Sequence, residues 1–128
     1  MGTVALLEAC RNVGKCVSIV CASSDKAYGD HEDLPYKETH ALKPRNTYDT
    51  SKACMDLISQ TYAANYGLPV IVTRCSNVYG PGDKNMSRLI PNTIRRVLQG
   101  DQPMLYSDIE EMEREFIYVD DVVDAYLA

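Results

Sequence analysis

Hydrophobic and polar positions along the chain follow the periods of helices and strands that succeed one another. Apolar residues recur at helical spacing over 3–13, and Gly14 ends that pattern. A short apolar run over 17–22 predicts a buried parallel strand. A long loop over 24–46, which two prolines interrupt, separates this strand from a helix over about 47–66. The first half therefore reads as helix, strand, long loop and helix.

The second half continues the alternation with shorter elements. An apolar run over 69–73 predicts a strand, so that strand, long helix and strand form a βαβ unit with a right-handed crossover. The remaining elements expected are a helix over 91–99, strands over 104–106 and 115–119, and a last helix that Asp120 caps. The predicted fold class is α/β with a parallel sheet.

Composition and charge exclude several classes of protein. The chain has 128 residues, which is the length of a single domain. Its net charge of −5 argues against nucleic-acid or anionic-membrane partners. No apolar run is long enough to span a membrane and no signal-peptide pattern is present, so we expect a cytoplasmic protein. The five cysteines form no C-x-x-C pair and predict reduced, mostly buried thiols. His31 and His40 lie in a polar loop region, so we expect no metal site.

Tyr48 and Lys52 are four residues apart on the predicted long helix, which makes their side chains neighbours. A free tyrosine titrates near about 10, and a nearby cation lowers the pKa of a phenol. The pair is therefore a candidate base for removing a proton from an alcohol. The alternative is an ordinary amphipathic helix with a half-buried tyrosine and a solvated lysine.

Other chemically active residues follow the two predicted strands of the βαβ unit. Residues 23–26 come after the first strand, and residues 74–77 come after the second. Ligands of such sheets bind beyond the carboxyl ends of the strands, so both segments should meet the helix that carries Tyr48 and Lys52. Taken singly, each group also has a structural explanation, such as opening a turn or satisfying loop backbone. Together they predict a proton-transfer site.

Four motifs carry a resemblance to a known family. They are Ser-Ser-Asp-Lys-Ala-Tyr-Gly over 23–29, Pro-Arg-Asn-Thr-Tyr-Asp-Thr-Ser-Lys over 44–52, Thr-Arg-Cys-Ser-Asn-Val-Tyr-Gly-Pro-Gly over 73–82, and Arg-Glu-Phe-Ile-Tyr-Val-Asp-Asp over 114–121. In this order they resemble the extended short-chain dehydrogenase/reductase family, the nucleotide-sugar epimerases and 4,6-dehydratases that use NAD. The chain is most similar to the CDP-glucose 4,6-dehydratase type, in which Asp-Lys follows the serine as Asp25 and Lys26 do here. Epimerases generally lack an acidic residue at the position of Asp25.

One departure from the family pattern is large. No Gly-rich turn of the kind that binds the dinucleotide pyrophosphate occurs in the chain. The resemblance therefore implies an internal fragment of a Rossmann-like, doubly wound parallel sheet. Residues 1–80 would be the C-terminal half of the NAD domain, and 81–128 the beginning of the sugar-nucleotide-binding region with a return to the sheet. Such a fragment is expected to be inactive alone and to self-associate through its exposed sheet edge.

The resemblance also implies roles for individual residues. Tyr48, helped by Lys52, would take the proton of the sugar 4-hydroxyl, and Ser24 would hold that hydroxyl. Asp25 would protonate the departing 6-hydroxyl, while Lys26 would remove the C5 proton or only orient the sugar.

The remaining implied contacts are to the cofactor and to the nucleotide sugar. Residues expected at NAD are Ser23, Tyr48, Lys52 and Ser76, and those expected at the sugar-nucleotide diphosphate are Asn77, Arg88 and Arg114. A nucleotide-sugar 4-epimerase or reductase of the same family, and a non-catalytic fragment, stay open as alternatives. The sequence does not identify the base, the product sugar or the oligomeric state.

Overall fold

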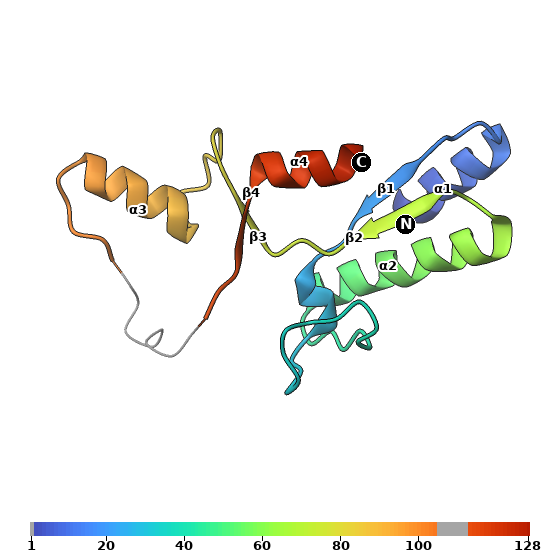
Figure 1. Ribbon diagram of the computed structural model, residues 1–128, viewed down its shortest axis with the longest axis horizontal. Helices are drawn as coiled ribbons and strands as arrows, with labels where there is room; N and C mark the ends of the chain where they lie inside the picture. Colours follow the sequence, from blue (N-terminus) through green and yellow to red (C-terminus); the bar gives the residue numbers. More distant parts are fainter. Residues whose placement is uncertain (1, 105–112) are drawn as a thin grey trace. The chain divides into compact units, whose positions relative to one another are not determined.

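The chain divides into two compact units, Met1–Ser76 and Asn77–Ala128, which are described separately below. The computed structural model (Figure 1) describes residues 2–104 and 113–128. Within that part of the chain, no helix is both long enough and apolar enough to cross a membrane.

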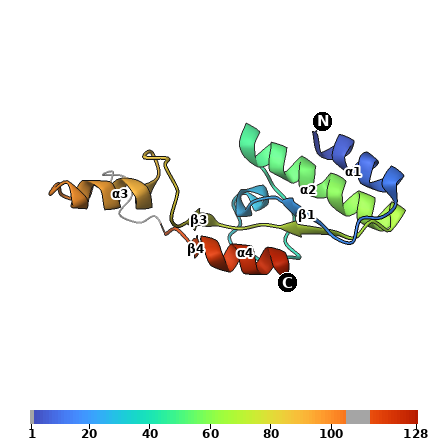
Figure 2. The ribbon, with the colours of Figure 1, turned by 90° about the horizontal axis from the view of Figure 1, so that it is seen from above.

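The first unit is a two-stranded parallel sheet with helices on one face. Its elements are α1 (Gly2–Val13), β1 (Ile19–Ala22), the short 3-10 helix η1 (Asp25–Tyr28), α2 (Thr47–Tyr66) and β2 (Val70–Thr73). Ile19 lies opposite Val70, and the register continues to Ala22 opposite Thr73. Figure 2 shows α1 and α2 side by side over the same face of this sheet. The predicted α/β class with parallel strands is confirmed.

The core of this unit lies between the sheet and the two helices. Side chains alternate across a strand, and Ile19 and Cys21 of β1 are buried together with Leu7 of α1. Ile71 of β2 lies between Val70 and Val72, which pack on the core, so its side chain is on the opposite face and is 56% exposed. β1 begins at Ile19, later than predicted. Val17, which is 93% exposed, lies outside the strand.

Both ends of α2 have sequence signals that the structure uses. The Asn46 side chain accepts a hydrogen bond from the backbone N–H of Asp49 (3.0 Å), as an N-cap residue does. Gly67 has a φ of +66° and ends the helix, with its N–H bonded to the carbonyl of Ala63. The helix that carries Tyr48 therefore begins and ends where it was predicted.

The second unit contains β3 (Asn77–Tyr79), α3 (Leu89–Leu98), β4 (Phe116–Tyr118) and α4 (Val119–Leu127). β3 and β4 are parallel, with Asn77 opposite Phe116. β3 was not predicted as a strand. The prediction that Asp120 caps the last helix is wrong, since α4 follows β4 directly, Tyr118 is its N-cap, and Asp120 lies in its first turn.

Two further sequence expectations concern the strand over 104–106 and the burial of the cysteines. Leu105 and Tyr106 of the predicted 104–106 strand lie outside the described residues. The prediction of mostly buried thiols is wrong. All five cysteines are free, but only Cys21 is buried, and Cys54 is exposed on α2.

Candidate functional site

The α2 helix places Lys52 at the carboxyl end of β1. The Lys52 Nζ donates a hydrogen bond to the backbone carbonyl of Ala22 (2.8 Å) and lies 5.8 Å from the ring centroid of Tyr48. The Tyr48 side chain is in the first turn of α2 and is 54% exposed. An ammonium group has three N–H donors, so its bond to Ala22 does not exhaust its capacity. Phenol and ammonium are thus neighbours on an open part of the helix.

The η1 turn supplies a compact polar cluster beside this pair. The Ser24 hydroxyl donates to Asp25 Oδ1 (2.9 Å) and accepts from the backbone N–H of Lys26 (3.2 Å), which starts η1. The Lys26 Nζ forms an ion pair with Asp25 Oδ2 (3.3 Å). Both carboxylate oxygens of Asp25 therefore have a donor from an adjacent residue.

Hydrogen bonds of Ser23 and Asp25 hold the start of η1 against α2 and against the end of β2. The Ser23 hydroxyl donates to the carbonyl of Lys52 (3.4 Å), and its N–H donates to the carbonyl of Thr73 (2.7 Å). The Asp25 N–H donates to the carbonyl of Cys75 (3.2 Å), which precedes the partly buried Ser76. The structure therefore brings together the three segments that the sequence placed at one edge of the sheet.

The predicted substrate-binding residues belong to the second unit. The Asn77 amide donates to the carbonyl of Glu115 (2.9 Å), so β3 is bonded to the residue that follows Arg114. Arg88 forms an ion pair with Asp83 (3.0 Å) in the segment before α3. Each of these residues keeps its predicted role as a proposal.

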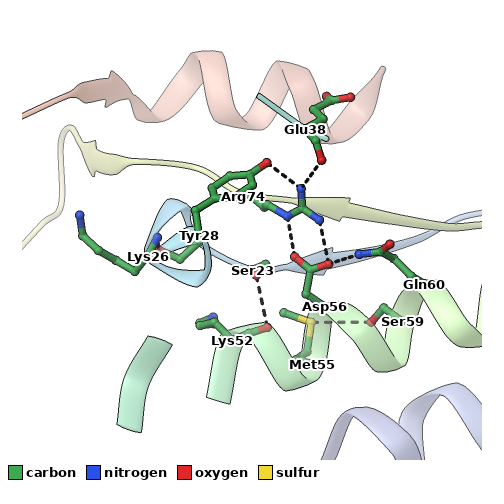
Figure 3. Close-up of polar contacts among 11 residues, drawn as sticks. Ser23, Lys26, Tyr28, Glu38, Lys52, Met55, Asp56, Ser59, Gln60 and Arg74 are labelled. Atoms are coloured by element: carbon green, nitrogen blue, oxygen red, sulfur yellow. Dashed lines mark hydrogen bonds and ion pairs between the residues drawn. The ribbon is translucent and has the colours of Figure 1, made fainter. Parts of the chain in front are cut away.

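A buried ion pair, which the sequence did not predict, lies next to the cluster. Figure 3 shows the guanidinium of Arg74 facing Asp56, whose side chain is completely buried. The Nε and Nη2 atoms of Arg74 donate to the two carboxylate oxygens at 2.6 and 3.0 Å, and Gln60 donates to Oδ1 at 2.5 Å. Such a bidentate pair has strict geometry as well as charge. It fixes α2 to the residue after β2.

The same arginine also joins the η1 turn to this pair. Its Nη1 donates to the Tyr28 hydroxyl (2.6 Å) and to the carbonyl of Glu38 (3.4 Å), and its guanidinium lies 4.9 Å from the Tyr28 ring centroid. Burial by itself raises the pKa of Asp56, but the hydrogen bonds from Arg74 and Gln60 and the Arg74 charge bring it below its ordinary value. The Asp56 carboxylate in turn raises the pKa of Arg74. Arg74 therefore has a structural role, which no local sequence pattern indicates because Asp56 is 18 residues away in the chain.

Cavities occur in both units, and neither coincides with the predicted catalytic residues. A cavity of about 750 Å³ in the first unit is lined in part by Tyr28, Gln60, Val72 and Arg74. A smaller cavity of about 400 Å³ in the second unit has a largely apolar lining that includes Tyr79, Gly80, Asp83, Met86, Ile90 and Tyr118. Among the described residues, no group of three His, Cys, Asp or Glu side chains is placed to hold a metal ion.

Comparisons with known proteins identify the family of this chain. The sequence model of the NAD-dependent epimerase/dehydratase family matches residues 1–128. A dTDP-glucose 4,6-dehydratase of Streptomyces griseus is 39% identical over 122 residues, which are 95% of this chain and 36% of that protein. The chain belongs to the NAD-dependent epimerase/dehydratase family.

Solved structures extend the similarity to the fold. The dTDP-glucose 4,6-dehydratase of Bacillus anthracis in complex with NAD matches with a TM-score of 0.84 and 36% identity, over 97% of this chain and 39% of that one. The UDP-N-acetylglucosamine 4-epimerase of Methanobrevibacter ruminantium matches with a TM-score of 0.87 and 30% identity, over 98% and 41%. The chain thus spans about two fifths of the length of these relatives. They are named for dTDP- and UDP-linked sugars, so the expected likeness to CDP-glucose enzymes is not what the comparisons found.

Proposed function

We propose that this chain carries the proton-transfer part of an NAD-dependent nucleotide-sugar 4,6-dehydratase. The observation that carries the proposal is the Ser24–Asp25–Lys26 cluster, which backbone bonds hold beside Lys52 and the end of β2. A 4,6-dehydratase needs a base at the 4-hydroxyl and an acid at the 6-hydroxyl. Tyr48 and Asp25 offer these two groups from adjacent elements.

The residues present fit one end of NAD. The exposed phenol of Tyr48 and the ammonium of Lys52 are open to a ribose or nicotinamide. Ser23 donates to the carbonyl of Lys52, and Ser76 follows Cys75, whose carbonyl accepts from Asp25. No Gly-rich pyrophosphate turn occurs among the 128 residues. Bound NAD would accept hydride from C4 of the sugar and return it to C6 after the 6-hydroxyl has left, so that the cofactor is not consumed. The chain therefore supplies contacts for the nicotinamide end and not for the pyrophosphate.

The protein residues would then move the protons. Tyr48 removes the proton of the 4-hydroxyl, and the Lys52 ammonium lies beside its ring. Ser24 holds that hydroxyl through its oxygen. Asp25 delivers a proton to the departing 6-hydroxyl. Lys26, which contacts Asp25, removes the C5 proton or orients the sugar.

The second unit would hold the rest of the substrate. A guanidinium matches phosphate geometry, so Arg88 and Arg114 are proposed contacts of the sugar-nucleotide diphosphate, with Asn77 beside them. On this assignment, residues 1–80 form the cofactor-facing part and residues 81–128 begin the nucleotide-sugar region. The two dehydratases among the relatives described above favour dTDP-glucose as the substrate, and CDP-glucose, which the Asp25–Lys26 pair suggested, is the alternative.

The test is a product analysis in a longer chain. The segments of the Streptomyces griseus dehydratase that precede and follow its matched region are joined to the two ends of this sequence, and the purified protein is incubated with NAD and dTDP-, UDP- or CDP-glucose. The proposal predicts a 4-keto-6-deoxy product from one of the three. A 4-epimer that keeps its 6-hydroxyl would instead support the epimerase alternative, which the similarity to a 4-epimerase structure keeps open.

A further inference from the structure

Three of the five thiols gather at one end of the core of the first unit. Cys10 is in the last turn of α1, Cys16 is in the segment that leads into β1, and Cys21 is on β1 itself. Cys10 and Cys16 both pack against the buried cluster of Leu7, Ile19 and Cys21. Both are partly exposed, whereas Cys21 is buried. Two neighbouring thiols are therefore accessible to a small reagent.

The chain reversal after α1 brings the two accessible thiols together. The N–H of Gly14 donates to the carbonyl of Cys10 (3.0 Å), and Gly14 adopts a φ of +64°, which turns the chain back along the helix. The nearby thiol of Cys16, followed by partial burial and the Cys21 sulfur, raises the pKa of Cys10. The segment that contains Cys16 thus turns back toward the last turn of α1, which contains Cys10.

We propose that Cys10 and Cys16 are a redox modification site, which closes to an intramolecular disulfide on exposure to a small disulfide oxidant such as oxidised glutathione. The bond would join the last turn of α1 to the segment that enters β1. This inference does not depend on the proposed dehydratase activity.

The reaction balances as two thiol–disulfide exchanges. The Cys16 thiolate attacks one sulfur of oxidised glutathione, a mixed disulfide forms, and the first glutathione leaves as a thiolate. Cys10 then loses its proton to solvent and attacks the Cys16 sulfur, the bond between Cys16 and glutathione breaks, and the second glutathione leaves. The two protein thiols are oxidised and glutathione disulfide is reduced to two thiols. Cys10 is the second nucleophile because its raised pKa leaves less of it as thiolate.

The experiment uses the chain of residues 1–128 in a Cys54→Ser background, since the exposed Cys54 would itself react with glutathione. The reduced protein is equilibrated with mixtures of reduced and oxidised glutathione, quenched with acid and treated with an alkylating reagent. The expected product is a monomer about 2 Da lighter that binds two fewer alkyl groups than the reduced protein. Cys10→Ser and Cys16→Ser should each lower this product at least about tenfold, whereas Cys75→Ser, the matched control, should leave it unchanged.

Mapping must separate Cys16 from Cys21, because no lysine or arginine lies between them and trypsin leaves both in the peptide 16–26. Fragmentation of this peptide cross-linked to 1–11 assigns the bond in the background chain and needs no substitution in the core. A bond to Cys21, disulfides only between two chains, or full alkylation of Cys10 and Cys16 under oxidising mixtures would each overturn the proposal.

Discussion

At the scale of single residues, the candidate site depends on where two side chains point. Lys52 reaches the carbonyl of Ala22 and passes near the Tyr48 ring, so one ammonium serves both β1 and the phenol. Asp25 is held from both sides by Ser24 and Lys26. The role of each residue can be tested in the longer chain described above.

Tyr48→Phe in that longer chain should remove most activity at every pH, because no phenolate can form. Loss of a general base costs on the order of a hundredfold or more. Lys52→Met should also lower the rate across the pH–rate profile, because it removes the ammonium group beside the Tyr48 ring. Rates are measured at saturating NAD, because Lys52 is also a proposed cofactor contact.

Tyr66→Phe is the matched control for the tyrosine substitution. Tyr66 is at the other end of α2 and is 53% exposed, close to the exposure of Tyr48. It should keep normal rates. An active Tyr48→Phe enzyme with an unchanged Lys52→Met profile would mean that the pair has a structural role only.

Asp25→Asn should slow loss of the 6-hydroxyl more than oxidation at C4. The asparagine keeps an oxygen that accepts from Ser24 but has no acidic proton for the leaving hydroxyl. Single-turnover measurements follow NADH formation for the first step and appearance of the 4-keto-6-deoxy sugar for the second. Equal slowing of both steps would contradict the acid role.

At the scale of elements, the buried ion pair holds α2, η1 and the end of β2 together. Asp56→Asn should lower the free energy of unfolding by about 3–5 kcal/mol, because it leaves the Arg74 charge without its anionic partner. Urea unfolding of the 128-residue chain at neutral pH measures this loss. Asp33→Asn is the control, since Asp33 pairs with Lys37 at the surface and is 69% exposed. Its effect should be small.

The same pair predicts an acid limit of stability. The pKa of Asp56 is lowered in the folded chain, so the unfolded chain binds more protons as the pH falls below its carboxylate range near about 4. The contribution of Asp56 is therefore complete above that pH and is lost as pH falls through the folded pKa. Unfolding curves between neutral and acidic pH should show this loss in the unsubstituted chain, and less of it in Asp56→Asn.

Gly29 marks the point where η1 meets the long loop. It has a φ of +67°, and a Cβ there would collide with the backbone carbonyl of Lys43. Gly29→Ala should therefore destabilise the chain more than Gly14→Ala, which has nearly the same φ of +64° but open space around it. Gly29 also has a ψ of −151°, a backbone region that is essentially restricted to glycine, so backbone strain adds to the collision. Equal losses for both variants, measured by thermal unfolding, would show that the Lys43 contact relaxes freely.

These elements also show which features can be predicted from sequence. The bounds of α2 follow from local signals, Asn46 at its start and Gly67 at its end. The strand β3 has only three residues and exists through pairing with β4, far along the chain, so no local pattern indicates it. For the same reason the ion pair between Asp56 and Arg74 was not predicted, because its two residues are far apart in the chain. Proximity of η1 to Lys52 was predictable because strand ends meet at one edge of a parallel sheet.

At the scale of the whole molecule, the proposed roles divide between two compact units. The proposed proton-transfer residues belong to the first unit, and the proposed diphosphate contacts belong to the second. Self-association through the exposed sheet edge stays a prediction, which sedimentation of the purified chain can test.

The chain of 128 residues should bind NAD weakly or not at all. Its contacts would reach the nicotinamide end only, because no Gly-rich pyrophosphate turn occurs in the sequence. Calorimetric titration measures the affinity, with the longer chain as the positive control. Micromolar binding by the 128-residue chain would mean that other residues take the place of that turn.

The spacing of Tyr48, Lys52 and Asp56 along α2 has a consequence for how this segment can change. The proposed base, its cation and the buried anchor follow one another at intervals of four residues on a single helix. Each residue added or removed between Lys52 and Asp56 rotates one part of the helix against the other by about 100°. Either Asp56 then no longer faces Arg74, or Lys52 no longer reaches the carbonyl of Ala22. Substitutions are thus tolerable at many positions of α2, whereas insertions and deletions between 48 and 56 are not.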